Sequence, residues 1–215
     1  MPQIKIIFFI IMFGLVSNFT QANSWDDFYS FINNTQTYQA NFTQSIKGNK
    51  SKITGKVSVK LPEKLRWETY NKNQQISQII TVNSSKNQKL AQIYDVDLYQ
   101  VIIKDLNRTQ SIIPADILLG KATLENLFIL QQSDQNSLED VGWLVAKSND
   151  LTSNDEIKEL KLKIENSRLL AIQIQDLLDR EIEINFSEIT INQPIDDQLF
   201  ILNLPEGVDI IDDTR

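Results

Sequence analysis

The side chains that most often perform acid–base or nucleophilic chemistry are missing from this sequence. It contains no histidine and no cysteine, so the commonest general base, the thiolate nucleophile and the ligands of most transition-metal sites are excluded. Its six glycines form neither a G-x-S-x-G nucleophile elbow nor a G-x-G-x-x-G phosphate-binding loop. Any catalysis would have to use carboxylates alone.

Paired acidic residues are the remaining candidates for such chemistry. The pairs are Asp95/Asp97, Asp196/Asp197 and Asp212/Asp213. Glycoside hydrolysis needs two carboxylates, but acidic pairs in the turns of an acidic protein are more often simply solvated. Calcium would also use carboxylates, yet no D-x-D-x-D-G loop is present. We therefore expect no enzyme, no metal site and no cofactor.

The N-terminal segment predicts a signal peptide. Lys5 is followed by an apolar run of eleven residues, which is shorter than the ~20 residues that cross a bilayer. Small residues at Thr20 and Ala22 fit a cleavage site, so we expect cleavage after Ala22, with an uncleaved anchor as the alternative. Residues 1–22 are thus assigned as a signal peptide and residues 23–215 as one domain.

Charge and cysteine content limit the possible partners. Cleavage removes one basic residue and no acidic one, so the net charge changes from −7 to −8. An exported acidic chain without a basic run is a poor partner for nucleic acid or an anionic lipid surface. The position where a bacterial lipoprotein carries its lipid-bearing cysteine reads Ala22-Asn23. We expect a soluble, untethered monomer that is stabilised by packing without disulfides.

An amphipathic helix is predicted at about 24–35. Ser24 followed by Asp27 resembles a capping box. The apolar residues that follow recur at i, i+3, i+4 and i+7, a spacing that places them on one helical face. They are Trp25, Phe28, Tyr29 and Ile32.

Alternation of apolar and polar residues predicts that most of the remaining chain forms β-strands. We expect strands at about 38–43, 53–61, 64–70, 76–83, 89–95, 97–104, 141–147, 157–165, 168–176, 180–189 and 199–205, before a charged tail. The proline and glycine of "SIIPADILLGKATLENLFIL" indicate one or two short helices over 114–127, leading into a further strand. The pattern predicts a mainly β protein with a few α-helices against the concave side of one strongly curved antiparallel sheet.

One strand poses the central question about function. In "LPEKLRWETY", residues 61–70, Leu65 and Trp67 point to the face opposite Lys64 and Arg66. Trp67 either fills an ordinary core or lines a cavity for an apolar ligand. Composition and periodicity leave both alternatives open.

Five stretches of the sequence resemble landmarks of a known family. They are "YQANFTQSI", "GKVSVKLPEKLRWE", "YDVDLYQV", "PADILLG" and "FILNLPEGVDII". In this order they are similar to the periplasmic outer-membrane lipoprotein carriers of the LolA family, over nearly the whole mature chain. The resemblance implies an incomplete, U-shaped antiparallel β-barrel of about eleven strands with a helical lid over an apolar cavity.

The resemblance also implies a function and its partners. A carrier of this family is a periplasmic chaperone that binds the acyl chains of lipoproteins. It would accept this cargo from an inner-membrane ABC-type lipoprotein-releasing complex and carry it to an outer-membrane lipoprotein receptor. The alternatives are a half-barrel protein with other lipid cargo, a sensor of mislocalised lipoproteins, and a structural module without a ligand.

The resemblance assigns candidate site residues. Leu65 and Trp67 match family positions on the cavity wall, and Ile117 and Leu118 match the lid helix after its proline. Strand parity adds further wall residues, namely Phe42, Val57, Val59, Ile174 and Phe186. The N-terminal helix contributes Trp25, Phe28 and Ile32 to the lid.

Two positions depart from the family pattern. The family usually has an arginine before the proline of this motif, where it helps to hold the lid shut, whereas this chain has Leu61. Lys60 and Arg66 are near in sequence, but strand parity directs them to the opposite face. We therefore expect a lid held mainly by apolar contact. The family's Asp-Gly hairpin and following tryptophan are also replaced, by "NSSKNQKLAQIYD".

Overall fold

The computed structural model describes residues 24–85, 88–107, 118–119, 128–132, 143–148 and 157–214. In these ranges its elements are α1 (Ser24–Asn34), β1 (Thr37–Ile46), β2 (Lys52–Lys60), β3 (Lys64–Tyr70), β4 (Ile76–Ser84), β5 (Lys89–Asp95), β6 (Gln100–Asp105), β7 (Phe128–Gln132), β8 (Trp143–Ser148), β9 (Ile157–Glu165), β10 (Arg168–Asp176), β11 (Glu181–Ile191), the 3₁₀ helix η1 (Asp197–Phe200) and β12 (Asp209–Asp213). The expected signal peptide and all but two residues of the expected helical stretch 114–127 lie outside the described residues.

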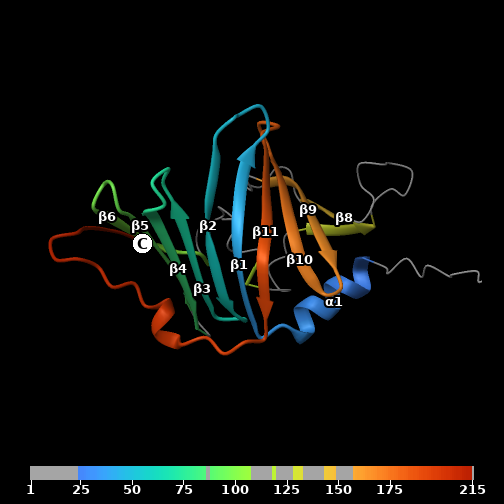
Figure 1. Cartoon of the computed structure of the whole chain (residues 1–215), viewed down its shortest axis with the longest axis horizontal. Helices are drawn as coiled ribbons and strands as arrows, with labels where there is room; N and C mark the ends of the chain where they lie inside the picture. Colours follow the sequence, from blue (N-terminus) through green and yellow to red (C-terminus); the bar gives the residue numbers. More distant parts are fainter. Residues whose placement is uncertain are drawn as a thin grey trace, which may run out of the picture.

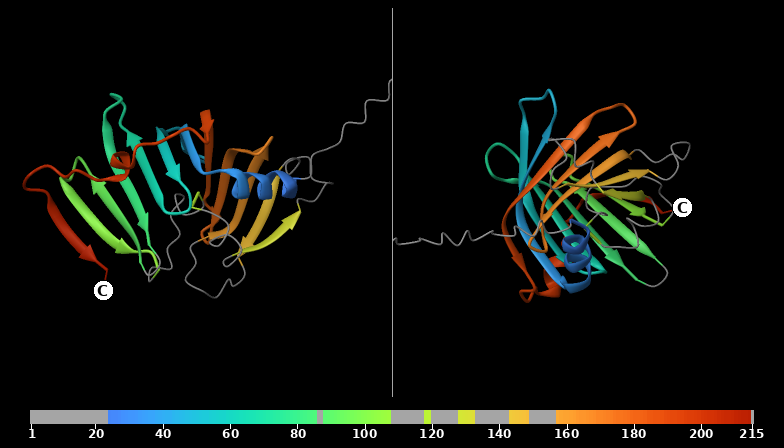
Figure 2. Two further views of the ribbon diagram at one scale, coloured as in Figure 1. Left: turned by 90° about the horizontal axis from the view of Figure 1, so that it is seen from below. Right: turned by 90° about the vertical axis from the view of Figure 1, so that its right-hand side faces the viewer.

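The strands form one open sheet in the order β12-β6-β5-β4-β3-β2-β1-β11-β10-β9-β8-β7 (Figure 1). Two meanders, β1–β6 and β7–β11, are joined at the centre by antiparallel pairing of β1 with β11. The sheet curves strongly around one face (Figure 2). The predicted mainly β fold, an incomplete barrel of about eleven antiparallel strands, is confirmed.

Side chains along the strands alternate between the inner and the outer face of the sheet. On β4, Ile80 and Val82 contact the large buried cluster, whereas Ile79, which precedes them and points to the other face, belongs to a second cluster. The same alternation on β5 places Ala91 inside and Tyr94 outside. The inner face therefore carries the main core, and a smaller apolar cluster covers part of the outer face.

The end of the chain differs from the prediction. The expected strand over 199–205 is wrong: this region begins with η1 and continues as irregular chain. Phe200 is buried, and Leu202, Leu204 and Val208 pack against the outer-face cluster around Tyr94. An extended segment lying on a sheet alternates in burial just as a strand does, which explains the error.

The expected charged tail contains an additional strand. β12 pairs in parallel with β6, with Ile210 beside Val101 and Asp212 beside Ile103. All five β12 residues are exposed. The C-terminal segment thus crosses the outer face and ends at one edge of the sheet (Figure 1).

The N-terminal helix confirms the predicted element and corrects its orientation. Phe28 and Phe31 are buried, whereas Tyr29, expected on the apolar face, is 36% exposed. The face of the helix that carries Phe28 and Phe31 is therefore the one that lies against the sheet. Among the described helices, none has the length and hydropathy of a membrane-spanning segment.

Candidate functional site

The seven predicted wall residues come together on the inner face. Each is at most 8% exposed, and all belong to one apolar cluster: Phe42, Val57, Val59, Leu65, Trp67, Ile174 and Phe186. Strand register explains their proximity, because Val57 pairs with Trp67 across β2–β3 and Phe42 pairs with Phe186 across β1–β11. Ile174 on β10 extends the cluster further into the second meander.

Aromatic rings form a continuous path through this cluster. The ring centroids of Phe42 and Trp67 are 4.1 Å apart, and those of Trp67 and Phe186 are 6.5 Å apart at 83°. Edge-to-face contacts continue from Phe186 to Tyr38 at 5.8 Å and from Tyr38 to Phe31 at 5.9 Å. Such pairs add about 0.5–1.5 kcal/mol each beyond their apolar burial. The path connects α1 with β3.

Gly55 makes room for the closest of these contacts. It lies opposite Phe42 in the β1–β2 ladder. A Cβ at this position would be 2.4 Å from the Phe42 ring and 1.9 Å from the carbonyl oxygen of Glu68. Only glycine therefore permits the Phe42 ring to lie over the β2 backbone and reach Trp67.

Phe31 and Tyr38 were missed as candidate site residues. Tyr38 shares its strand face with Phe42, so its position on the inner face was predictable, but the partner of its hydroxyl group was not. That hydroxyl donates to the Leu169 carbonyl oxygen at 2.9 Å, and burial raises the pKa of Tyr38 far above its usual range. The phenol is thus a neutral part of the apolar interior.

The predicted lid residues are only partly described. Phe28, Ile32 and Leu118 contact the same apolar cluster as the wall residues, and the neighbouring Leu119 joins them. The Trp25 side chain and Ile117 lie outside the described residues. In this structure the wall of the predicted cavity is covered by side chains of α1 and of residues 118–119.

Polar contacts hold both ends of α1. Near its start, the Asp27 carboxylate accepts from the Ser167 backbone N–H at 3.3 Å, and the Ser167 hydroxyl donates to the Ser30 hydroxyl at 2.8 Å. Beyond its end, Asn192 donates to the Asn34 carbonyl at 2.8 Å and accepts from the Gln36 N–H at 2.7 Å. The first set fastens the helix to the β9–β10 turn, and the second fixes its junction with β1.

The contacts around Leu61 agree with the predicted strand parity. Leu61 packs against the main cluster. Lys60 pairs instead with Asp197 at 2.6 Å, and the Arg66 guanidinium donates to the Leu199 carbonyl at 3.2 Å. Both cations therefore hold the C-terminal segment rather than α1. That the lid is held mainly by apolar contact stays a prediction.

The three carboxylate pairs make structural contacts. Asp95 accepts from the Leu98 N–H and Asp196 from the Gln198 N–H, as turn and helix caps. Asp212 accepts from Thr214. Asp197 accepts from Lys60 and Lys64 at 2.6 and 2.9 Å, and these hydrogen bonds lower the pKa of its carboxyl group. Within the described ranges, no three His, Cys, Asp or Glu side chains converge as metal ligands.

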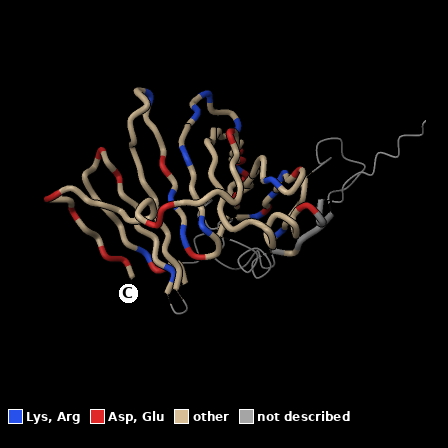
Figure 3. The backbone as a smooth tube through the Cα atoms, turned by 60° about the horizontal axis from the view of Figure 1, so that its bottom comes forward, with Lys and Arg blue, Asp and Glu red and all other residues tan. Residues whose placement is uncertain are grey.

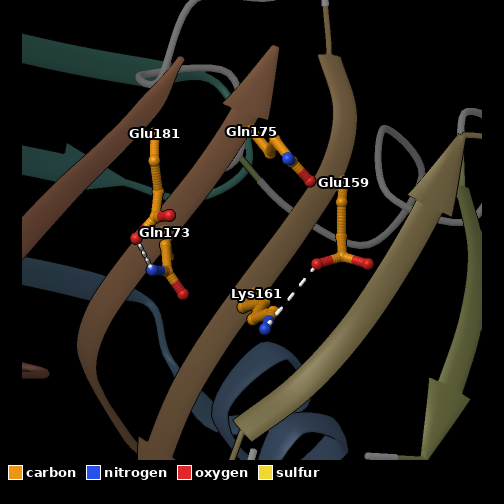
Figure 4. Close-up of a pocket in the computed structure, with 5 residues that line it drawn as sticks. All are labelled: Glu159, Lys161, Gln173, Gln175 and Glu181. Atoms are coloured by element: carbon orange, nitrogen blue, oxygen red, sulfur yellow. Dashed lines mark hydrogen bonds and ion pairs between the residues drawn. The ribbon is translucent and has the colours of Figure 1, made fainter. Parts of the chain in front are cut away.

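A polar depression of about 80 Å³ lies on the outer face of β9, β10 and β11 (Figure 4). Glu159, Lys161, Gln173, Gln175 and Glu181 line it. Glu181 accepts from Gln173 and pairs with Lys47, and Lys161 lies 3.7 Å from Glu159. The Lys47 and Gln173 hydrogen bonds lower the pKa of Glu181. Its polar lining and small volume do not suit a hydrocarbon chain.

Comparison with known proteins identifies the family of this chain. Residues 33–203 match the model of the outer membrane lipoprotein carrier protein LolA. An outer-membrane lipoprotein carrier protein of Francisella philomiragia is 32% identical over 206 residues, covering 92% of this chain and 93% of the relative. A protein of the same name from Hahella chejuensis is 26% identical over 200 residues, covering 91% of each.

One solved structure supports the fold. The putative outer membrane lipoprotein-sorting protein domain from Vibrio parahaemolyticus superimposes with a TM-score of 0.51 and 10% identity, covering 82% of this chain and 94% of that domain. The open curved sheet, the apolar inner face beneath α1 and the match over most of the sequence agree. This chain belongs to the LolA family of outer membrane lipoprotein carrier proteins.

Proposed function

We propose that this protein is a non-catalytic periplasmic carrier that binds the acyl chains of lipoproteins on the inner face of its sheet. One observation carries the proposal: a continuous apolar surface, from Trp67 on β3 to Ile174 on β10, lies beneath a short helix and residues 118–119. The relatives that share this sequence pattern are named as lipoprotein carriers.

The energetics explain why such a surface is needed. An acyl chain of about fifteen methylenes costs on the order of 12 kcal/mol to expose to water, at ~0.8 kcal/mol per methylene. Transfer between two membranes across an aqueous compartment therefore needs an apolar escort. The wall residues supply aliphatic and aromatic surface that has no polar group to satisfy, apart from the indole nitrogen of Trp67.

Release of cargo follows from competition for the same wall. Phe28 and Phe31 of α1 and Leu118 occupy the inner cluster. A bound acyl chain must displace some of these side chains, and their return favours release. Because both processes exchange apolar contacts for apolar contacts, the difference in free energy between the loaded and empty states is small compared with either burial alone.

The donor and acceptor form the finer part of the proposal. We propose that the carrier accepts its cargo from an inner-membrane ABC-type lipoprotein-releasing complex and delivers it to an outer-membrane lipoprotein receptor. The supporting observation is family membership over residues 33–203. The predicted signal peptide is consistent with a periplasmic location.

Binding of a fluorescent acylated lipopeptide tests the central claim. Leu65→Glu and Trp67→Glu place a charge on the wall and should abolish binding, because an unpaired carboxylate in an apolar site is strongly unfavourable. Lys56→Glu is the matched control, since Lys56 is exposed on the adjacent strand β2. Circular dichroism establishes that each variant is folded. Normal binding by a folded Trp67→Glu protein would refute the proposed site.

A release assay tests the transport step. Purified mature protein is added to spheroplasts, and newly made lipoproteins are followed from the membrane to the soluble fraction. The unmodified protein should release them, and Trp67→Glu should not. Lipoproteins that stay on the membrane with this protein, while an authentic carrier releases them, would contradict the carrier function.

A further inference from the structure

Exposed apolar side chains gather at one end of the sheet. The antiparallel register brings the β1–β2, β3–β4 and β10–β11 turns to the same end of the sheet. A hydrogen bond from the Lys47 N–H to the Glu181 carbonyl joins the β1–β2 turn to the β10–β11 turn. We name residues 46–53, 71–76 and 177–180 the three-turn rim. Its exposed large apolar side chains are Ile46, Ile53, Ile76, Leu177 and Leu178, the last of them 75% exposed.

The rim is basic although the whole chain is acidic. It contains five basic residues and one acidic residue: Lys47, Lys50, Lys52, Lys72 and Arg180 against Asp179. The charge of the rim is thus +4, or +2 when the flanking Asp176 and Glu181 are included, compared with −7 for the full chain. The blue segments at the tips of the hairpins show this concentration (Figure 3).

Three of these lysines have no ionic partner in the described part of the chain. Lys47, Arg180 and Asp179 are within ion-pair distance of Glu181, Asp176 and Lys158 respectively. Lys50, Lys52 and Lys72 are exposed and have no carboxylate within 4.0 Å among the described residues. Their charge is therefore available to an external anion.

We propose that the three-turn rim binds the surface of an anionic phospholipid bilayer. Leu177, Leu178, Ile46 and Ile53 would enter the boundary between headgroups and acyl chains. The lysines beside them would contact lipid phosphates, with their aliphatic stems alongside the acyl region. This combination of exposed aliphatic residues and unpaired lysines is what a negatively charged interface attracts.

A bilayer fits this surface better than a protein partner does. Lysine is depleted from the cores of protein–protein interfaces, whereas here it separates the apolar residues. The apolar side chains also lie on separate turns instead of in one groove. A fluid interface accommodates such separated anchors, because lipids rearrange around each of them.

The position of the rim leaves the helix-covered region free. α1 leads into the start of β1 at Thr37, whereas the rim begins at the other end of that strand, at Ile46. In Figure 1 the hairpin tips point upward and α1 lies at the lower right. Contact through the rim would orient the protein on the membrane without covering α1.

Vesicle co-sedimentation tests the proposal. The mature protein should sediment with vesicles that contain phosphatidylglycerol, and less with vesicles of phosphatidylcholine alone. Lys50→Ser/Lys52→Ser should weaken binding roughly thirtyfold, at about fivefold for each lysine near the surface. Leu177→Ser/Leu178→Ser should weaken it by a factor of about ten or more. Added salt should reduce binding by the unmodified protein.

Control variants remove two lysines, and one exposed apolar side chain, elsewhere. Lys56→Ser/Lys163→Ser removes two lysines outside the rim, and Ile201→Ser removes a side chain that is 47% exposed, as Leu177 is. These variants should bind vesicles as the unmodified protein does. All of the substituted residues are at least partly exposed, and thermal unfolding measures whether each variant is folded.

Several outcomes would overturn the proposal. The first is that the protein binds no vesicle of any composition. The second is that the rim variants bind vesicles as well as the unmodified protein does. The third is that the rim variants bind vesicles normally and lose only their binding to a purified membrane protein. Lipopeptide binding in solution separates this proposal from the carrier function. The rim variants should retain lipopeptide binding, and Trp67→Glu should retain vesicle binding.

Discussion

A reversible covalent link between α1 and the β9–β10 turn should stop loading of cargo. The Ser30 and Ser167 hydroxyl oxygens are 2.8 Å apart, so cysteines at both positions would bring two sulfur atoms close to bonding distance. The chain has no other cysteine, so Ser30→Cys/Ser167→Cys can form only this intramolecular disulfide.

The magnitude follows from the length of the closed loop. The two residues are 137 positions apart. Loop-closure entropy for this length stabilises the folded state by about 5 kcal/mol. For a domain of this size the expected increase in Tm is about 10–20 °C. The same bond would hold α1 over the wall in the oxidised protein.

Lipopeptide binding under oxidising and reducing conditions is the assay. The oxidised double variant should bind at least tenfold more weakly than the reduced form, and addition of dithiothreitol should restore binding. Each single cysteine variant, treated in the same way, is the control and should bind normally in both conditions. Equal binding by the oxidised and reduced double variant would refute the argument that α1 competes with cargo.

Three further substitutions test contacts elsewhere in the fold. Gly55→Ala should lower the stability by about 1–3 kcal/mol or more, because the new Cβ overlaps the Phe42 ring. Chemical denaturation measures this loss, and an unchanged denaturation midpoint would contradict the prediction. Asp197→Asn should lower the Tm at neutral pH. Because the Lys60 hydrogen bond lowers the folded-state pKa of Asp197 below its usual 3.8, the stabilisation is present above that pH and is lost as the pH falls through the folded-state pKa. The difference in Tm between the two proteins should therefore shrink in acid, and a constant difference from neutral pH to strong acid would exclude this cause. Asn192→Ala should cost about 1–3 kcal/mol through the hydrogen bonds it removes at the end of α1, and hydrogen exchange should become faster in α1 but not in β3.

Most strands could be predicted from alternation because each has one face on the core. On β9, for example, Leu160 and Leu162 are buried between half-buried polar neighbours. The same signal failed at residues 199–205. There the apolar side chains pack on the outer face of β4, β5 and β6, but the backbone does not pair with a strand of the sheet. Alternation reports which side of a segment is covered, and does not distinguish a strand from a segment that lies on a sheet.

The inner-face position of the predicted wall residues followed from the sequence, but the contacts among them did not. Leu65 and Trp67 lie on the predicted face, whereas the approach of Phe42 to Trp67 depends on the missing side chain at Gly55. The apolar face of α1 was assigned one position out of phase, because a helix with apolar residues at 28, 29, 31 and 32 has two similar faces. Packing against the sheet determines which face is covered, and it buries Phe31 but not Tyr29.

The pairing of β1 with β11 has a consequence for biogenesis. Phe42 and Phe186 are neighbours in the sheet but lie 144 positions apart in the chain. A polypeptide that crosses a membrane N-terminus first presents β1 long before β11, so the central seam of the fold forms only when translocation is nearly complete. Contacts of such long sequence separation form slowly. If the predicted signal peptide directs export, β1 and β11 would still be unpaired during most of the passage across the membrane.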